Sequence, residues 1–176
     1  MEQIIVTKES KDLAVFDQLF TEAFPPAERV LPSTLADYDF ITLNGFYEND
    51  KPVGMLVTID GPGFVYILFL ATFAEYRGQG IGSKIINAFY ANKPDAFTIG
   101  VIEKPDEAVE NNAQRLARQK FYTRLGYSVH DFGMKFNGCD FLTIAKGKDS
   151  EKRESVEPHW NLILKTLDEL AVAYGK

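Results

Sequence analysis

One segment of the sequence, Phe64–Thr72 (FVYILFLAT), is apolar at nearly every position instead of alternating between apolar and polar side chains. A strand of this kind is expected at the centre of a sheet, with both of its faces covered. After a glycine-rich turn, apolar residues recur at helical spacing: Ile81, Ile85, Ala88 and Phe89. Residues 97–102 read as a further buried strand. Residues 64–103 therefore predict a strand–helix–strand unit with two parallel strands.

The residues before this unit predict smaller elements. Residues 3–7 suit a short strand, and apolar spacing over 13–24 predicts a helix that ends at Pro25-Pro26. A short helix is expected over 31–38, with Pro32 tolerated in its first turn. Two β-rich runs, 40–47 and 53–59, are separated by a turn sequence, which indicates an antiparallel hairpin.

The residues after the unit predict one helix, two strands and a last helix. The helix covers 112–125 and ends at Gly126, and the strands cover 128–135 and 140–146 around Asn137-Gly138, a strong hairpin signal. The final segment places apolar residues on one stripe: Trp160, Ile163, Leu164, Leu167, Leu170, Ala171 and Tyr174. Docking on the core is the expected role of that stripe, and a homodimer interface is the alternative.

Composition narrows the class of protein. With 176 residues, 45% of them hydrophobic, the chain fits one domain with a packed core. The net charge of −6 argues against broad nucleic-acid binding. No apolar run approaches the roughly 20 residues that span a bilayer, and the first residues lack a secretory signal, so we expect a cytoplasmic protein that does not bind membranes.

A single cysteine, Cys139, cannot form an intramolecular disulfide, and no Cys/His group has the spacing of metal ligands. We therefore expect no metal. Cys139 could act as a nucleophile, but neither histidine belongs to a recognisable triad motif. The interpretation of Cys139 as a small buried or turn-flanking residue is favoured.

The glycine-rich turn, residues 77–83 (RGQGIGS), is the most informative feature for function. Glycines let a backbone approach a ligand closely, and free amides at a helix start attract a pyrophosphate. Arg77 can add a charged donor. A turn that merely redirects the chain is the alternative, because glycine turns are common.

Two nucleotide-binding motifs compete for the same residues. The Walker A motif fails because Ser83, and not a glycine, precedes Lys84. The Rossmann fingerprint matches Gly78 and Gly80, has Ser83 in third place, and finds Glu103 near the usual distance for a ribose-binding acid. Residues 73–77 separate the strand from the first glycine, however, so a dinucleotide-binding oxidoreductase is the lesser alternative.

The segment from Arg77 to Gly82 resembles the Arg/Gln-x-x-Gly-x-Gly/Ala motif of the GNAT superfamily of acyl-CoA N-acyltransferases. Residues 121–127 (FYTRLGY) resemble the Phe-Tyr-x-x-x-Gly-Phe segment of the same family. The resemblance implies the GNAT fold of the α+β (α/β) class, a mixed and largely antiparallel twisted sheet of about seven strands flanked by helices. It covers an acetyltransferase domain over 1–148, with 149–176 as a loop and amphipathic helix packed on that domain.

The resemblance also implies a cofactor site. Pantetheine would pair with backbone groups of the strand end, and the pyrophosphate would lie on the glycine turn. The implied residues are Leu70, Ala71, Thr72, Arg77, Gly78, Gln79, Gly80, Ile81, Gly82 and Ser83. One position departs from the family, since Arg115 stands where an Asn often contacts the cofactor. Acetyl-CoA is thus the expected co-substrate.

Acyl transfer from a thioester needs an unprotonated amine, a stabilised oxyanion and a proton for the departing thiolate. The resemblance makes Tyr122 the candidate acid, because a phenol can donate to a developing thiolate. Glu103 is the candidate base, with Glu22 and Glu28 as rivals. The expected function is transfer of an acetyl group to a primary amine of a small molecule or peptide, and a non-catalytic acyl-CoA-binding domain is the alternative.

Overall fold

The computed structural model describes the backbone of residues 1–26, 28–136 and 138–173, and the side chains of these residues up to Asp168. The chain divides into two compact units. The first unit contains residues 1–60 and 67–96, and the second contains residues 61–66 and 97–176. The domain boundary that the sequence predicts at residue 148 stays a prediction.

The described residues of the first unit form four strands and three α-helices. They are β1 (Glu2–Val6), α1 (Leu13–Ala23), α2 (Pro32–Leu35), β2 (Ile41–Glu48), β3 (Lys51–Gly61), the second part of β4 (Phe64–Thr72) and α3 (Ile81–Asn92). β2 pairs antiparallel with both β1 and β3. Asn49 and Asp50 have positive φ angles and form the tight turn of the β2–β3 hairpin. The predicted hairpin is confirmed, whereas α2 is shorter than the predicted helix over 31–38.

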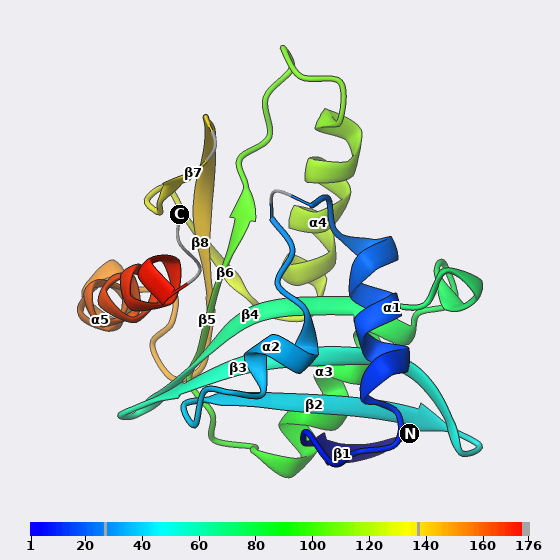
Figure 1. The fold of residues 1–176 in the computed structure, drawn as a ribbon. Coiled ribbons are helices and arrows are strands. Elements are labelled where there is room, and N and C mark those ends of the chain that lie inside the picture. The colour runs from blue at the N-terminus through cyan, green and yellow to red at the C-terminus, as the bar shows by residue number, and fades with distance from the viewer. Residues whose placement is uncertain (27, 137, 174–176) are drawn as a thin grey trace. The chain divides into compact units, whose positions relative to one another are not determined.

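Two glycines show how helices pack on this part of the sheet. A Cβ on Gly45 of β2 would lie 3.0 Å from the Phe16 ring of α1, and a Cβ on Gly54 of β3 would lie 2.6 Å from Ile85 of α3. Gly45 pairs with Met55, the neighbour of Gly54, so the two glycines point to opposite faces. The helices α1 and α3 therefore cover opposite faces of these strands, as Figure 1 shows.

The second unit is built around β8. It contains the first residues of β4, then β5 (Thr98–Glu103), α4 (Asn112–Arg124), β6 (Ser128–His130), β7 (Lys135–Phe136), β8 (Cys139–Lys146) and α5 (Arg153–Ala173). β8 pairs antiparallel with β5, β6 and β7. The amide of Val65 donates to the carbonyl of Phe97 at 2.8 Å, which joins the start of β4 to the chain leading into β5.

The strand order is β1-β2-β3-β4-β5-β8-β6, with β7 paired to β8. The sheet is mostly antiparallel and has one parallel pair, β4 and β5, which α3 connects. The predicted fold, a mixed and largely antiparallel sheet flanked by helices with the apolar strand at its centre, is confirmed. A dinucleotide-binding fold would need a parallel doubly wound sheet, so the oxidoreductase alternative is wrong.

The predicted strand over 128–135 is interrupted in the structure. β6 ends at His130 and β7 begins at Lys135. A Cβ on Gly133 would lie 2.2 Å from the carbonyl oxygen of Phe141, so the chain passes very close to β8 there. The pairing of Phe136 with Cys139 confirms the predicted hairpin, although Asn137 itself lies outside the described residues.

The last helix, α5, buries the beginning of its apolar stripe. Val156, Trp160 and Ile163 are at most 4% exposed, and the Trp160 ring lies 6.5 Å from that of Tyr66 in the same unit. This part of the stripe is therefore buried in the second unit, and the docking of 149–176 on the domain over 1–148 stays a prediction. The side chains of Leu170 and Ala171, and all of Tyr174, lie outside the described residues. A homodimer interface stays a prediction.

Candidate functional site

The loop between β4 and α3 has a backbone that only glycine adopts easily. Gly78 has a φ of 75°, and Gly80, the residue before α3, has a φ of 75° and a ψ of 9°. Both conformations are left-handed, and a side chain would oppose them. The glycines of the RGQGIG sequence therefore set the path of the chain into the helix.

The surface over these glycines is open. A Cβ placed on Gly78 or on Gly80 would meet no heavy atom within 4 Å, and residues 77–80 are exposed. The first intrahelical bond of α3 joins the Lys84 amide to the Gly80 carbonyl at 3.1 Å. The amides of residues 81–83 thus have no acceptor inside the helix, and they lie at the positive end of its dipole. This geometry suits a diphosphate.

Side chains tie the loop to the strand that precedes it. The Arg77 Nε atom lies 3.4 Å from the Thr72 carbonyl, and the Gln79 side-chain amide donates to the Glu75 carbonyl at 2.6 Å. A 3₁₀ turn, Ala74–Tyr76, lies between these contacts. The loop is therefore held in place by its own chain, and its outer side is left for a ligand.

The end of β4 is less buried than the sequence predicts. Residues 64–67 are buried, but Leu68, Phe69, Leu70 and Thr72 are part-exposed, and Ala71 is buried. The expectation that both faces of this strand are covered is therefore wrong for its second half. The structure brings this half together with the glycine loop in the first unit, as the cofactor prediction requires.

In the second unit, Glu103 at the end of β5 contacts two arginines of α4. Its Oε1 atom lies 3.2 Å from Arg115 Nη2, and its Oε2 atom lies 2.5 Å from Arg118 Nη1. Asn111 donates to Oε1 at 3.3 Å. Lys104, the next residue in the chain, pairs with Asp131 instead. The sequence does not indicate these partners, because Arg115 and Arg118 of α4 lie more than ten residues after Glu103 in the chain.

Tyr122 is the one described residue of α4 that is buried, with 7% of its surface exposed. Its ring packs edge-on against Tyr127 at 5.2 Å. Burial raises the pKa of Tyr122 to about 12, and the charge of Arg118 opposes this shift. The phenol is therefore protonated throughout the neutral range.

Most of α4 has an exposed surface. Arg115 and Arg118 share one face, because both contact Glu103. Ala113 and Ala117 are exposed, and Leu116 is 41% exposed. The aromatic residues near the helix end decide the packing.

The rival bases in the first unit are exposed. Glu22 accepts a hydrogen bond from Gln18 at 2.9 Å on α1. Glu28 is exposed as well, and the guanidinium of its neighbour Arg29 donates to the Thr21 carbonyl at 3.0 Å.

Two further features concern other kinds of site. Burial raises the pKa of the Cys139 thiol, which disfavours the thiolate that a nucleophile needs. Among the described residues, no group of three His, Cys, Asp or Glu side chains could hold a metal ion. In the same part of the chain, no helix is long and apolar enough to cross a membrane.

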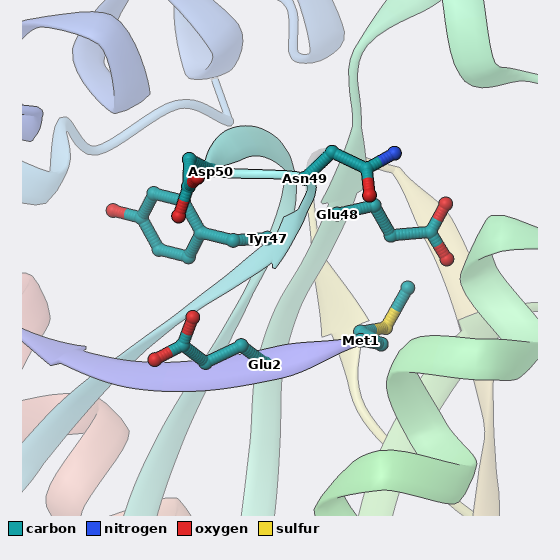
Figure 2. Close-up of a pocket in the computed structure, with 6 residues that line it drawn as sticks. All are labelled: Met1, Glu2, Tyr47, Glu48, Asn49 and Asp50. Atoms are coloured by element: carbon teal, nitrogen blue, oxygen red, sulfur yellow. The ribbon is translucent and has the colours of Figure 1, made fainter.

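A hollow at the β2–β3 turn, shown in Figure 2, is lined by Met1, Glu2, Tyr47, Glu48, Asn49 and Asp50. The Glu48 carboxylate is paired with Lys84 at 3.0 Å, and the Tyr47 hydroxyl lies 3.2 Å from Asp12. None of the predicted site residues lines this hollow, so the glycine loop remains the candidate site.

Comparison with known proteins agrees with this geometry. Residues 42–129, half of the chain, match the family model of the acetyltransferase (GNAT) domain. The chain belongs to this family and is an acyltransferase of the GNAT type. No curated protein matches the sequence.

Solved structures share the fold at low sequence identity. A GNAT-family protein from Bacteroides thetaiotaomicron has a TM-score of 0.73 at 22% identity, over 90% of this chain and 94% of that one. An acetyltransferase from Elizabethkingia anophelis with acetyl-CoA bound has a TM-score of 0.59 at 15% identity, over 83% and 97%. The aminoglycoside 6′-N-acetyltransferase from Enterococcus faecium has a TM-score of 0.60 at 15% identity, over 83% and 96%.

Proposed function

We propose that this protein transfers the acetyl group of acetyl-CoA to a primary amine, with both substrates bound at once. The observation that carries the proposal is the loop of residues 77–83, whose exposed, left-handed Gly78 and Gly80 lead into α3, where the first amides have no acceptor inside the helix. The acetyl-CoA bound to the similar protein from Elizabethkingia anophelis supports the choice of co-substrate.

In this proposal, the diphosphate of acetyl-CoA binds the amides of residues 81–83, and Arg77 supplies a charged donor. Pantetheine pairs with the backbone of Leu70, Ala71 and Thr72, and an amide there stabilises the negative charge that develops on the thioester oxygen. The amine nitrogen forms a bond to the acetyl carbon as the carbon–sulfur bond breaks. The partially exposed end of β4 supports this placement.

Tyr122 is the proposed acid that donates a proton to the departing thiolate. The phenol carries its proton at neutral pH, and with a pKa of about 12 it donates only as negative charge develops on the departing sulfur. We expect Tyr122→Phe to lower kcat by about 100-fold or more, with little change in the Kd of acetyl-CoA. Tyr127→Phe is a matched control, since Tyr127 is also a buried tyrosine with a hydrogen-bonded hydroxyl. Full turnover by Tyr122→Phe would refute the assignment.

Glu103 is the proposed base that accepts the proton of the amine, through a water molecule. Its carboxylate is part-exposed, which lets water reach it, and both oxygens contact cations. The test is the dependence of kcat/KM on pH in Glu103→Gln. Loss of the acidic limb supports the role, whereas an unchanged limb leaves Glu103 as a partner that positions Arg115 and Arg118.

The function itself is tested in two steps. Acetyl-CoA should raise the melting temperature of the protein, and release of free thiol should then follow on addition of a primary amine from a broad panel. Stabilisation by acetyl-CoA without thiol release from any amine would indicate an acyl-CoA-binding domain without turnover.

A further inference from the structure

Three phenylalanine rings meet in the first unit, beside the proposed thioester site. The Phe69 ring of β4 lies 5.4 Å from that of Phe20 on α1 and 5.0 Å from that of Phe24, which follows α1. The rings of Phe20 and Phe24 lie 5.2 Å apart. Figure 1 shows α1 lying over the strands from which this contact is made.

The three rings differ in exposure. Phe20 is fully buried, whereas Phe24 and Phe69 are part-exposed, as are Leu68 and Leu70 on either side of Phe69. A partially uncovered run of apolar side chains on a central strand is unfavourable in water unless a ligand covers it. The exposed edges of Phe24 and Phe69 therefore form an apolar surface suited to a ligand.

This surface lies close to the place where the proposed reaction occurs. Phe69 directly precedes Leu70, and it points to the same side of β4 as Ala71, two residues and about 7 Å along the strand. An attacking amine must approach the acetyl carbon to about 3 Å. The group that carries this amine therefore comes within reach of Phe24 and Phe69.

The rings themselves offer no charge to a substrate. The three side chains are neutral, and the two carboxylates of α1 accept hydrogen bonds within this unit, Asp17 from the Ser33 amide at 2.9 Å and Glu22 from Gln18. The Arg29 guanidinium donates to the Thr21 carbonyl near the end of α1. A polycationic amine gains no ion pair from Phe24 and Phe69, whereas an apolar group covers their exposed surface.

We propose that Phe24 and Phe69 select acceptors in which the primary amine is attached to an aromatic or branched aliphatic group. The inference rests on the proposed acetyltransferase function and names the substrate class of that site. An aminoglycoside, the acceptor in the name of the similar Enterococcus faecium enzyme, belongs to the class that this surface disfavours.

The experiment compares acceptors under steady-state conditions at saturating acetyl-CoA. We expect kcat/KM for 2-phenylethylamine to exceed that for ethanolamine and for kanamycin by about tenfold or more. Phe24→Ala and Phe69→Ala should each raise the KM for 2-phenylethylamine by about tenfold, with no change in its value for ethanolamine or acetyl-CoA. Phe40→Ala is the matched control, because Phe40 is also a part-exposed aromatic residue, paired with Tyr38 before β2.

Phe69→Leu keeps an apolar side chain on β4 and provides the same test if Phe69→Ala does not fold. A kcat/KM for ethanolamine or kanamycin equal to or above that for 2-phenylethylamine would overturn the inference and leave the acetyltransferase function intact. An equal rise in KM for 2-phenylethylamine in Phe40→Ala would also overturn it. Absence of transfer to every amine would refute the proposed function, and this inference with it.

Discussion

Substitution of Gly80 by alanine tests whether CoA binding depends on the left-handed backbone of the loop. At this position a side chain has space, so backbone conformation alone opposes the substitution. A Cβ on Gly80 meets no atom within 4 Å, so the substitution creates no clash. The φ of 75° remains, and an L residue in this region costs about 1 kcal/mol or slightly more. We therefore expect Gly80→Ala to lower the melting temperature by about 3 °C.

The same strain should weaken CoA binding. If alanine leaves the loop in its binding conformation about a tenth of the time, the Kd of CoA rises about tenfold, equivalent to about 1.4 kcal/mol. Isothermal titration calorimetry with CoA measures this change. Pantetheine lacks the diphosphate, so its affinity should not change.

Gly63 provides a matched control. It has a φ of 80°, and a Cβ there also meets no atom within 4 Å, but it lies in the turn before β4. Gly63→Ala should lower stability by a similar amount and leave the Kd of CoA unchanged. An equal loss of CoA affinity in Gly63→Ala, or an equal loss of pantetheine affinity in Gly80→Ala, would refute the reasoning.

Two further predictions concern stability. The pKa of Tyr122 is raised from 10 to about 12, so its contribution to stability is present below pH 10 and is lost as the pH rises to about 12. Between pH 10 and 12, the unfolding free energy of Tyr122→Phe should fall by about 2–3 kcal/mol less than that of the unsubstituted protein, as measured by urea unfolding at each pH. An equal fall in both proteins would contradict this. Gly54→Ala should destabilise the protein by about 1–3 kcal/mol, because its Cβ would lie 2.5 Å from the Ala71 carbonyl oxygen. Unfolding curves identical to those of the unsubstituted protein would show that β3 and β4 are free to move apart.

The sequence predicted most elements because their signals are local. The end of α1 before Pro25-Pro26, the turn at Asn49-Asp50 and the glycine at the C-terminus of α4 all depend on a few neighbouring residues. The glycine loop was found in the same way.

The errors arose where distant residues decide the structure. The break between β6 and β7 follows from the close approach of Gly133 to Phe141, which the sequence does not reveal. The second half of β4 was expected to be covered on both faces because it is apolar. Its partial exposure instead accompanies the contact of Phe69 with α1, and that aromatic surface was not predicted from the sequence.

Few buried apolar side chains hold α4 on its unit, and this should affect how easily the helix opens locally. α3 buries four apolar side chains, whereas α4 buries Tyr122 and otherwise contacts β5 through the ion pairs of Glu103. Screening by salt weakens ion pairs at a surface far more than apolar burial. Amide hydrogens of α4 should therefore exchange with deuterium faster as sodium chloride is added, while exchange in α3 stays nearly constant.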